Sequence, residues 1–259
     1  MFRRVLVCSA LLTATIAMSA CGGGSPSQPE GGAPAAPAAA PAPPPAPIGA
    51  STITGTVKLE GTPPEARVIR MSSDPLCMPE GPTRSEVVLV GPGNGLQNVF
   101  VYVKDGLGDR TFQAPTTPVV LDQQGCKYMP HVFGAQVGQP VLIKNSDGTL
   151  HNVHAVPKVN EEFNFGQPLK GMETTRTFGK PEIMVPFRCD VHGWMAAYGG
   201  VVPHPFYAVT AADGTFEIKG LPAGTFTIET WHEQFGLQTQ TVTVDGTAAG
   251  KADFNYKAS

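Results

Sequence analysis

From residue 51 onward, hydrophobic positions fall in short runs rich in valine, isoleucine, threonine and phenylalanine, and glycine, proline, asparagine and aspartate separate these runs. The clearest runs are Thr52–Leu59, Val87–Val90, Val99–Lys104, Val141–Asn145, Phe226–Trp231 and Gln238–Val244. No amphipathic stretch is long enough for a substantial helix. The pattern therefore predicts an all-β chain of sandwich architecture with Greek-key connections, in which chemistry is carried on loops.

The first fifty residues follow a different pattern. Residues 1–20 carry two arginines, an apolar stretch and then small residues, which is the order of an export signal. The letters MSAC resemble the bacterial lipobox, and that resemblance implies cleavage before Cys21 and a lipid on this cysteine. An ordinary secretory signal with an incidental cysteine is the alternative. We expect an exported protein held to the cell envelope by lipid, and Gly22 indicates the outer membrane, facing the periplasm.

Residues 21–50 are almost entirely glycine, alanine, serine and proline after the cysteine, so they predict a disordered linker without a core. The formal net charge is −3, and it becomes −5 when the two arginines of residues 1–20 are removed. No run of lysine or arginine is present, which argues against nucleic acid as a partner.

The five cysteines have different settings: Cys8 in the signal, Cys21 at the lipobox, Cys189 in a His/Met cluster, and Cys77 and Cys126 elsewhere. In an oxidising compartment Cys77 and Cys126 can form a disulfide, which would close a loop of about 50 residues and contribute roughly 4 kcal/mol in the chain-entropy model. Two buried free thiols are an alternative. A third interpretation makes Cys126 part of another metal site with His131.

The segment FRCDVHGWM, residues 187–195, places a thiol, an imidazole and a thioether at Cys189, His192 and Met195. A thiolate and imidazoles bind copper in a trigonal arrangement, and a thioether serves as a weak axial ligand that tunes the reduction potential. Alone, the spacing is only suggestive, since Met195 can fill a core and His192 can lie on a surface. A copper site of this kind needs a second histidine.

The segment KNSDGTLHNVHA, residues 144–155, contains candidates for that histidine. Here the chain resembles the cupredoxin family of plastocyanin-like and amicyanin-like blue copper proteins, and the resemblance runs from about residue 119 to 202. It implies a Greek-key sandwich holding one type 1 copper, with His151, Cys189, His192 and Met195 as ligands. The His192 to Met195 spacing matches the short ligand loop of the amicyanin-like members.

The same resemblance assigns roles to neighbouring residues. Asn152 would hydrogen-bond near Cys189 and hold the two ligand loops together, with Asn145 supporting the turn before them. His154 competes with His151 as a ligand. Odd spacing along a strand turns these two histidines to opposite faces, so only one of them can serve, and the family pattern favours His151.

In this family the later histidine emerges through an apolar surface patch. The resemblance therefore implies that His192 is an electron exit, with Gly193, Trp194 and Pro130 around it. We expect the other histidines, His131, His204 and His232, to be structural.

Residues 207–231, YAVTAADGTFEIKGLPAGTFTIETW, resemble the carboxypeptidase regulatory-like domain, a smaller transthyretin-like sandwich. The matching features are the Asp213-Gly214 turn and the turn at residues 222–224. A strand with the ITGTV pattern that opens such domains lies far upstream, at residues 53–57. We therefore expect residues 51–112 and 205–259 to form this sandwich, with the cupredoxin domain, 113–204, inserted. Two sequential partial domains are the alternative.

These features predict an electron carrier and not an enzyme. Its partner would be a c-type cytochrome or a periplasmic oxidoreductase, and its contact with the membrane would be through the lipid alone. A copper-binding module for delivery, storage or sensing is the alternative, because the same ligands suit a more labile site.

Overall fold

The computed structural model describes residues 48–78, 81, 83–246 and 248–258. The predictions for the signal, Cys21 and nearly all of the linker lie outside these residues. The described chain is all-β, as predicted; its helical segments are two short 3-10 turns, η1 (Pro75–Cys77) and η2 (Pro92–Asn94). Within the described ranges, no helix has the length and apolar character needed to cross a bilayer.

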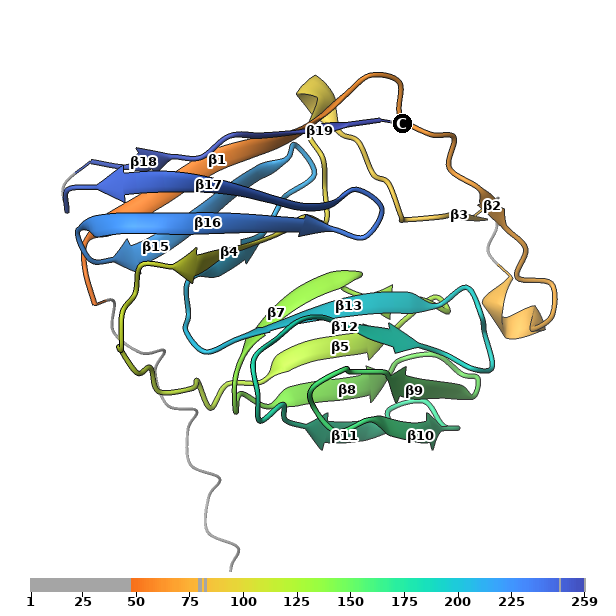
Figure 1. Cartoon of the computed structure of the whole chain (residues 1–259). Helices are drawn as coiled ribbons and strands as arrows, with labels where there is room; N and C mark the ends of the chain where they lie inside the picture. The colour runs from red at the N-terminus through yellow and green to blue at the C-terminus, as the bar shows by residue number, and fades with distance from the viewer. Residues whose placement is uncertain (1–47, 79–80, 82, 247, 259) are drawn as a thin grey trace, which may run out of the picture. The chain divides into compact units, whose positions relative to one another are not determined.

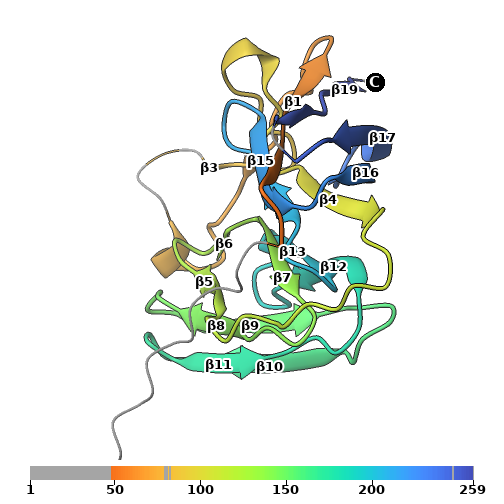
Figure 2. The ribbon, with the colours of Figure 1, turned by 90° about the vertical axis from the view of Figure 1, so that its left-hand side faces the viewer.

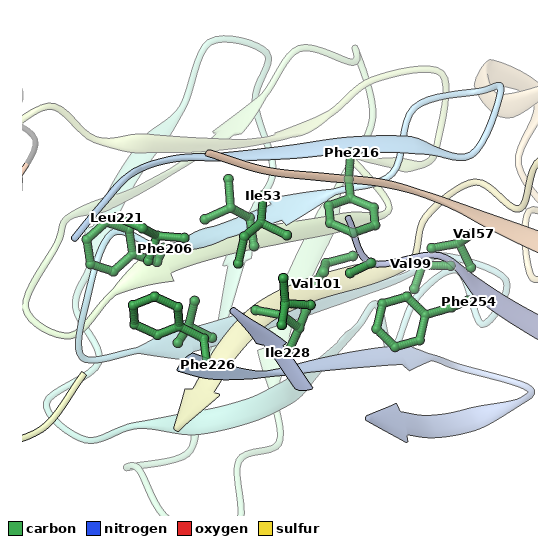
Figure 3. Close-up of a cluster of buried hydrophobic side chains, with 14 of the residues drawn as sticks. Ile53, Val57, Val99, Val101, Phe206, Phe216, Leu221, Phe226, Ile228 and Phe254 are labelled. Atoms are coloured by element: carbon green, nitrogen blue, oxygen red, sulfur yellow. The ribbon is translucent and has the colours of Figure 1, made fainter. Parts of the chain in front are cut away.

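The first sandwich consists of two sheets built from the two ends of the described chain. One sheet contains β1 (Ser51–Glu60), β15 (Thr215–Leu221), β18 (Gly250–Lys251) and β19 (Phe254–Lys257), and the other contains β4 (Phe100–Asp105), β14 (Tyr207–Val209), β16 (Gly224–His232) and β17 (Gly236–Val244). Buried residues alternate along β1, as expected for a strand with one face on a core. Figure 3 shows that core, in which Ile53, Val101 and Phe226 come from both sheets.

The second sandwich also has two sheets. The strand order of one is β10 (Phe163–Gln167), β9 (His151–Ala155), β12 (Glu182–Arg188), β13 (Ala196–Val202), β7 (Val132–Gln136); the order of the other is β11 (Glu173–Arg176), β8 (Val141–Asn145), β5 (Val119–Gln123), β6 (Tyr128–Met129). Strands β5 and β8 are parallel, as are β7 and β13, so the chain crosses between the sheets and does not meander. These strands are green to teal in Figure 1.

All strands of the second sandwich lie between β4 and β14 in the sequence. This strand order is the one that an insertion produces, and the domain limits themselves stay a prediction. The two sandwiches meet where Phe100 of β4 packs with Val132 and Val202. Glycine allows this close approach: a Cβ at Gly200 would lie 2.4 Å from the Phe100 ring.

A long connection joins β1 to β4. It contains η1, η2 and a two-stranded ribbon of β2 (Val68–Ile69) and β3 (Thr83–Arg84). The strand predicted at Val87–Val90 is wrong, because only Val90 forms a bridge, to Leu96. Val88 and Val90 instead pack against the core of the first sandwich with their side chains, which satisfies their hydrophobicity without strand pairing.

Candidate metal centre

The four candidate ligands lie at one end of neighbouring strands in the five-stranded sheet. His151 is the first residue of β9, Cys189 follows the last residue of β12, and Met195 precedes β13. His192 lies in the loop that joins β12 to β13. The side chains of all four are buried, with at most 2% of each residue exposed. The sheet thus brings a residue from one loop together with three from another.

Three of these side chains converge. The Nδ1 atoms of His151 and His192 are 2.9 Å apart, and the Cys189 Sγ lies 3.9 Å from the His192 Nδ1. The three ligand atoms of this cluster lie within 4.8 Å of one another. Each imidazole therefore presents the same ring nitrogen to the thiol.

Backbone hydrogen bonds close the loop from Cys189 to Met195. The Met195 amide donates to the His192 carbonyl at 2.9 Å, and the Cys189 amide donates to the Met195 carbonyl at 3.3 Å. Met195 is fully buried and packs in the same hydrophobic cluster as Cys189. The backbone thus holds the thioether residue beside the thiol residue.

Polar groups surround the Cys189 sulfur. The His192 amide donates to it at 3.3 Å, and the Cys189 thiol donates to the Asn152 Oδ1 at 3.3 Å. The same Asn152 oxygen accepts the amides of Asp190, at 2.6 Å, and Val191, at 3.2 Å. Asn152 therefore connects β9 to the loop after β12.

His151 is oriented by Asp147, whose Oδ2 lies 2.9 Å from the His151 Nε2. The carboxylate of Asp147 accepts the amides of Gly125 and Cys126, each at 2.8 Å. Burial lowers the pKa of His151, and the charge of His192 adds to this effect, although the hydrogen bond with Asp147 opposes it. The imidazole is therefore neutral at pH 7, the form whose lone pair can bind a metal.

His192 is covered, whereas the resemblance implied that it emerges at the surface. Only 2% of the residue is exposed, and its Nε2 lies 3.1 Å from the Asp74 Oδ2 and 3.7 Å from the Cys77 Sγ. Figures 1 and 2 both show the η1 turn, in orange, beside the loops at this end of the second sandwich. Gly193 and Pro130 are exposed as expected, but the expected exit at the His192 ring is wrong because η1 lies over it.

Cys77 and Cys126 form a disulfide. Two further groupings of possible ligands contain one of these sulfurs each, Asp74 with Cys77 and His192, and Cys126 with Asp147 and His151. A disulfide sulfur is not a thiolate, so neither grouping offers the charged sulfur that a metal requires. The cluster around Cys189 is the one with a free thiol.

The remaining predicted residues have other contacts. His154 is oriented away from His151; its Nδ1 lies 3.0 Å from Asp190 and its Nε2 lies 2.7 Å from Glu162. Asn145 donates to the carbonyl oxygens of residues 149 and 167 and accepts the amide of Asp147. It therefore shapes the turn that presents Asp147 and does not contact the thiol loop through these bonds.

Sequence reasoning missed Asp147 and Asp74. The position of Asp147, four residues before His151 in an Asn-Ser-Asp-Gly turn, is a local signal that could have identified it. Asp74 has no such signal, because 118 residues separate it from His192.

The chemistry of this donor set fits copper. Two imidazole nitrogens and one thiol converge, and a buried methionine follows in the same loop. A thiolate with two imidazoles and a weak thioether is the ligand set of type 1 copper, whereas structural zinc sites use four cysteine or histidine ligands. His151, Cys189, His192 and Met195 would hold the ion.

No family model and no curated protein matches the chain. Among solved structures, the chain is similar to a copper-containing nitrite reductase from Thermus scotoductus SA-01, with 24% identity and a TM-score of 0.29 over 37% of this chain and 24% of that chain. It is also similar to a Cu(I) form of an amicyanin variant, with 22% identity and a TM-score of 0.30 over 39% of this chain and 97% of that chain.

Proposed function

We propose that this chain is a type 1 copper protein of the cupredoxin class that transfers single electrons. The observation that carries the proposal is the buried convergence of the His151 and His192 Nδ1 atoms with the Cys189 sulfur. Copper bound there would supply one-electron exchange between Cu(I) and Cu(II). The surrounding residues fix the ligands: Asp147 orients His151, and Asn152 fixes the loop of Cys189.

Burial of the ligand atoms supports electron transfer over the alternative of copper delivery, storage or sensing. An ion exchanged with a partner protein needs an open approach for the partner's ligands. Here the Cys189 and His192 residues are each 2% exposed and His151 is fully buried. Electrons can cross such a covering by tunnelling, whereas an ion can cross it only when the covering opens.

The cellular setting is part of the same proposal. We propose that the protein is exported, lipidated on Cys21 and held at the outer membrane, and that it exchanges electrons with a c-type cytochrome or a periplasmic oxidoreductase. The export pattern of residues 1–20 and the linker composition support this. The lipidation is tested by labelling cells that express the chain with a radioactive fatty acid: the wild-type chain should take up label and Cys21→Ser should not.

The site itself is tested by the visible absorption and EPR spectra of the full chain loaded with Cu(II). A thiolate-to-copper charge-transfer band is expected in the wild type and in His154→Ala. The band should be absent in Cys189→Ser and disrupted in His151→Ala. Copper binding without this band in the wild type would show that the thiolate is not a ligand and would favour the delivery or storage function.

A further inference from the structure

The outer nitrogen of each candidate histidine ligand faces a carboxylate. Asp147 lies 2.9 Å from the His151 Nε2, and Asp74 lies 3.1 Å from the His192 Nε2. When the Nδ1 lone pair of a neutral imidazole binds a metal, its proton resides on Nε2 and is donated outward. Each carboxylate is therefore placed to accept the proton of one ligand.

Asp74 is itself held in place by two donors. Its Oδ1 accepts the Leu76 amide at 2.9 Å, which caps η1, and its Oδ2 accepts the Thr149 hydroxyl at 2.6 Å. Thr149 lies two residues before His151, so the carboxylate contacts both histidine-bearing loops.

The disulfide ties the two carboxylate anchors together. Cys77 ends the turn that Asp74 caps, and the Cys126 amide donates to Asp147 at 2.8 Å. Breaking Cys77–Cys126 would therefore loosen the support of both carboxylates at once. Asp147 lies four residues before His151 in the sequence, whereas Asp74 lies in the long connection between β1 and β4, far from His192 in the sequence.

We propose that Asp74 is the positioning residue of His192: it accepts the Nε2 proton of this ligand, fixes the ring over the site and places a negative charge beside the metal. This inference rests on the proposed copper function. Partners of this kind keep the imidazole oriented and raise its basicity. A fixed anion next to the ligand also stabilises Cu(II) more than Cu(I), because Cu(II) carries the larger positive charge.

Asp74→Asn separates this role from the capping of η1. The asparagine Oδ1 can still accept the Leu76 amide, since asparagine is as good a cap as aspartate. Its amide group replaces the oxygen that faces His192 and cannot accept the Nε2 proton. We expect the copper affinity of the full chain to fall about 10- to 100-fold, the reduction potential to rise and the Cu(II) EPR parameters to change.

Two further variants complete the experiment. Thr149→Val removes the hydroxyl that fixes Asp74 without altering the carboxylate, and it should shift affinity and potential in the same direction but less. Asp213→Asn is the matched control, because Asp213 caps a turn of the first sandwich through the amide and hydroxyl of Thr215. Asp213→Asn should leave the copper affinity and the reduction potential unchanged.

The outcomes separate the two levels of the proposal. A wild-type chain without the charge-transfer band would refute the copper function itself. A wild type with the band, together with Asp74→Asn of unchanged affinity, potential and EPR spectrum, would overturn the role of Asp74 and leave the copper function standing. Circular dichroism and thermal unfolding of the metal-free variants show whether each is folded; an unfolded Asp74→Asn leaves the decision to the potential of Thr149→Val, which must rise for the proposal to stand.

Discussion

The side-chain oxygen of Asn152 accepts a hydrogen bond from the Cys189 thiol at 3.3 Å while it also accepts two backbone amides of the following loop. One buried atom thus links the strand that begins with His151 to the loop that carries the other candidate ligands. The site depends on this link because its ligands come from two separate loops.

Asn152→Ala should lower the free energy of unfolding by about 1–3 kcal/mol, since the buried Cys189 thiol and the part-buried amides of Asp190 and Val191 lose their shared acceptor. It should also weaken copper binding, because the Cys189 loop is no longer held against β9. Urea unfolding of the metal-free protein and copper titration measure the two effects. Asn164→Ala is the control: Asn164 bonds to the same network from its exposed side. Equal losses in both variants would contradict a special role for Asn152.

Removal of the disulfide by Cys77→Ala with Cys126→Ala should destabilise the protein by roughly 4 kcal/mol, because the bond closes a long loop of the unfolded chain. Guanidinium unfolding with and without reductant measures this loss in the wild type, and reductant should have no effect on the double variant. Faster removal of bound copper by a chelator is also expected, since Asp74 and η1 are then no longer tied over His192. Unchanged chelator kinetics in a folded double variant would show that η1 covers the site without this bond.

The extent to which the sequence predicts the site depends on the distance between its parts along the chain. Cys189, His192 and Met195 lie within one loop, so their spacing reveals them together. His151 follows a strand and a turn that can be recognised locally. The contact of Asp74 with His192 joins the connection between β1 and β4 to the loop between β12 and β13, and no nearby residue indicates it. For the same reason the covering of His192 could not be foreseen.

The fold shows a similar division. The all-β class and strands such as Val141–Asn145 follow from short runs that contain β-branched residues, with every second residue buried in this strand. The run at Val87–Val90 is also rich in valine, but Val88 and Val90 pack partly buried against the core of the first sandwich, and within the run only Val90 forms a bridge. Local propensity cannot distinguish a run that pairs in a sheet from a run that only packs against a core, because both arrangements bury hydrophobic side chains.

Gly200→Ala should destabilise the protein by about 1–3 kcal/mol, as overpacking of a filled interior does. The added methyl would lie 2.4 Å from the Phe100 ring, where β13 meets β4. Thermal unfolding measures the change. Gly166→Ala is the control, because its methyl would meet only the Leu150 side chain at 3.7 Å. Equal melting temperatures for the two variants would mean that the sandwiches separate readily enough to accept the methyl.

His232 should make the stability depend on pH. The residue is 1% exposed, and within the described residues its Nε2 has no hydrogen-bond partner. Burial lowers the pKa of His232 to about 4, with the charge of His131 acting in the same direction and that of Glu233 opposing it. At pH values between about 4, the pKa in the folded protein, and about 6.5, the pKa in the unfolded chain, His232 binds a proton in the unfolded chain but not in the folded protein.

The free energy of unfolding should therefore fall as the pH drops through this window, by up to about 1.4 kcal/mol per pH unit from this group. Above the window neither state is protonated at His232, and the contribution to the slope disappears. Urea unfolding at a series of pH values tests this in the wild type and in His232→Asn, whose oxygen can still accept the Gln234 amide. In His232→Asn the free energy of unfolding should depend less steeply on pH than in the wild type, whatever the absolute stability of the variant. Phe235→Leu, which disturbs the ring stacked on His232, should lower stability and keep the slope; an unchanged slope in His232→Asn would show that another group controls the acid sensitivity.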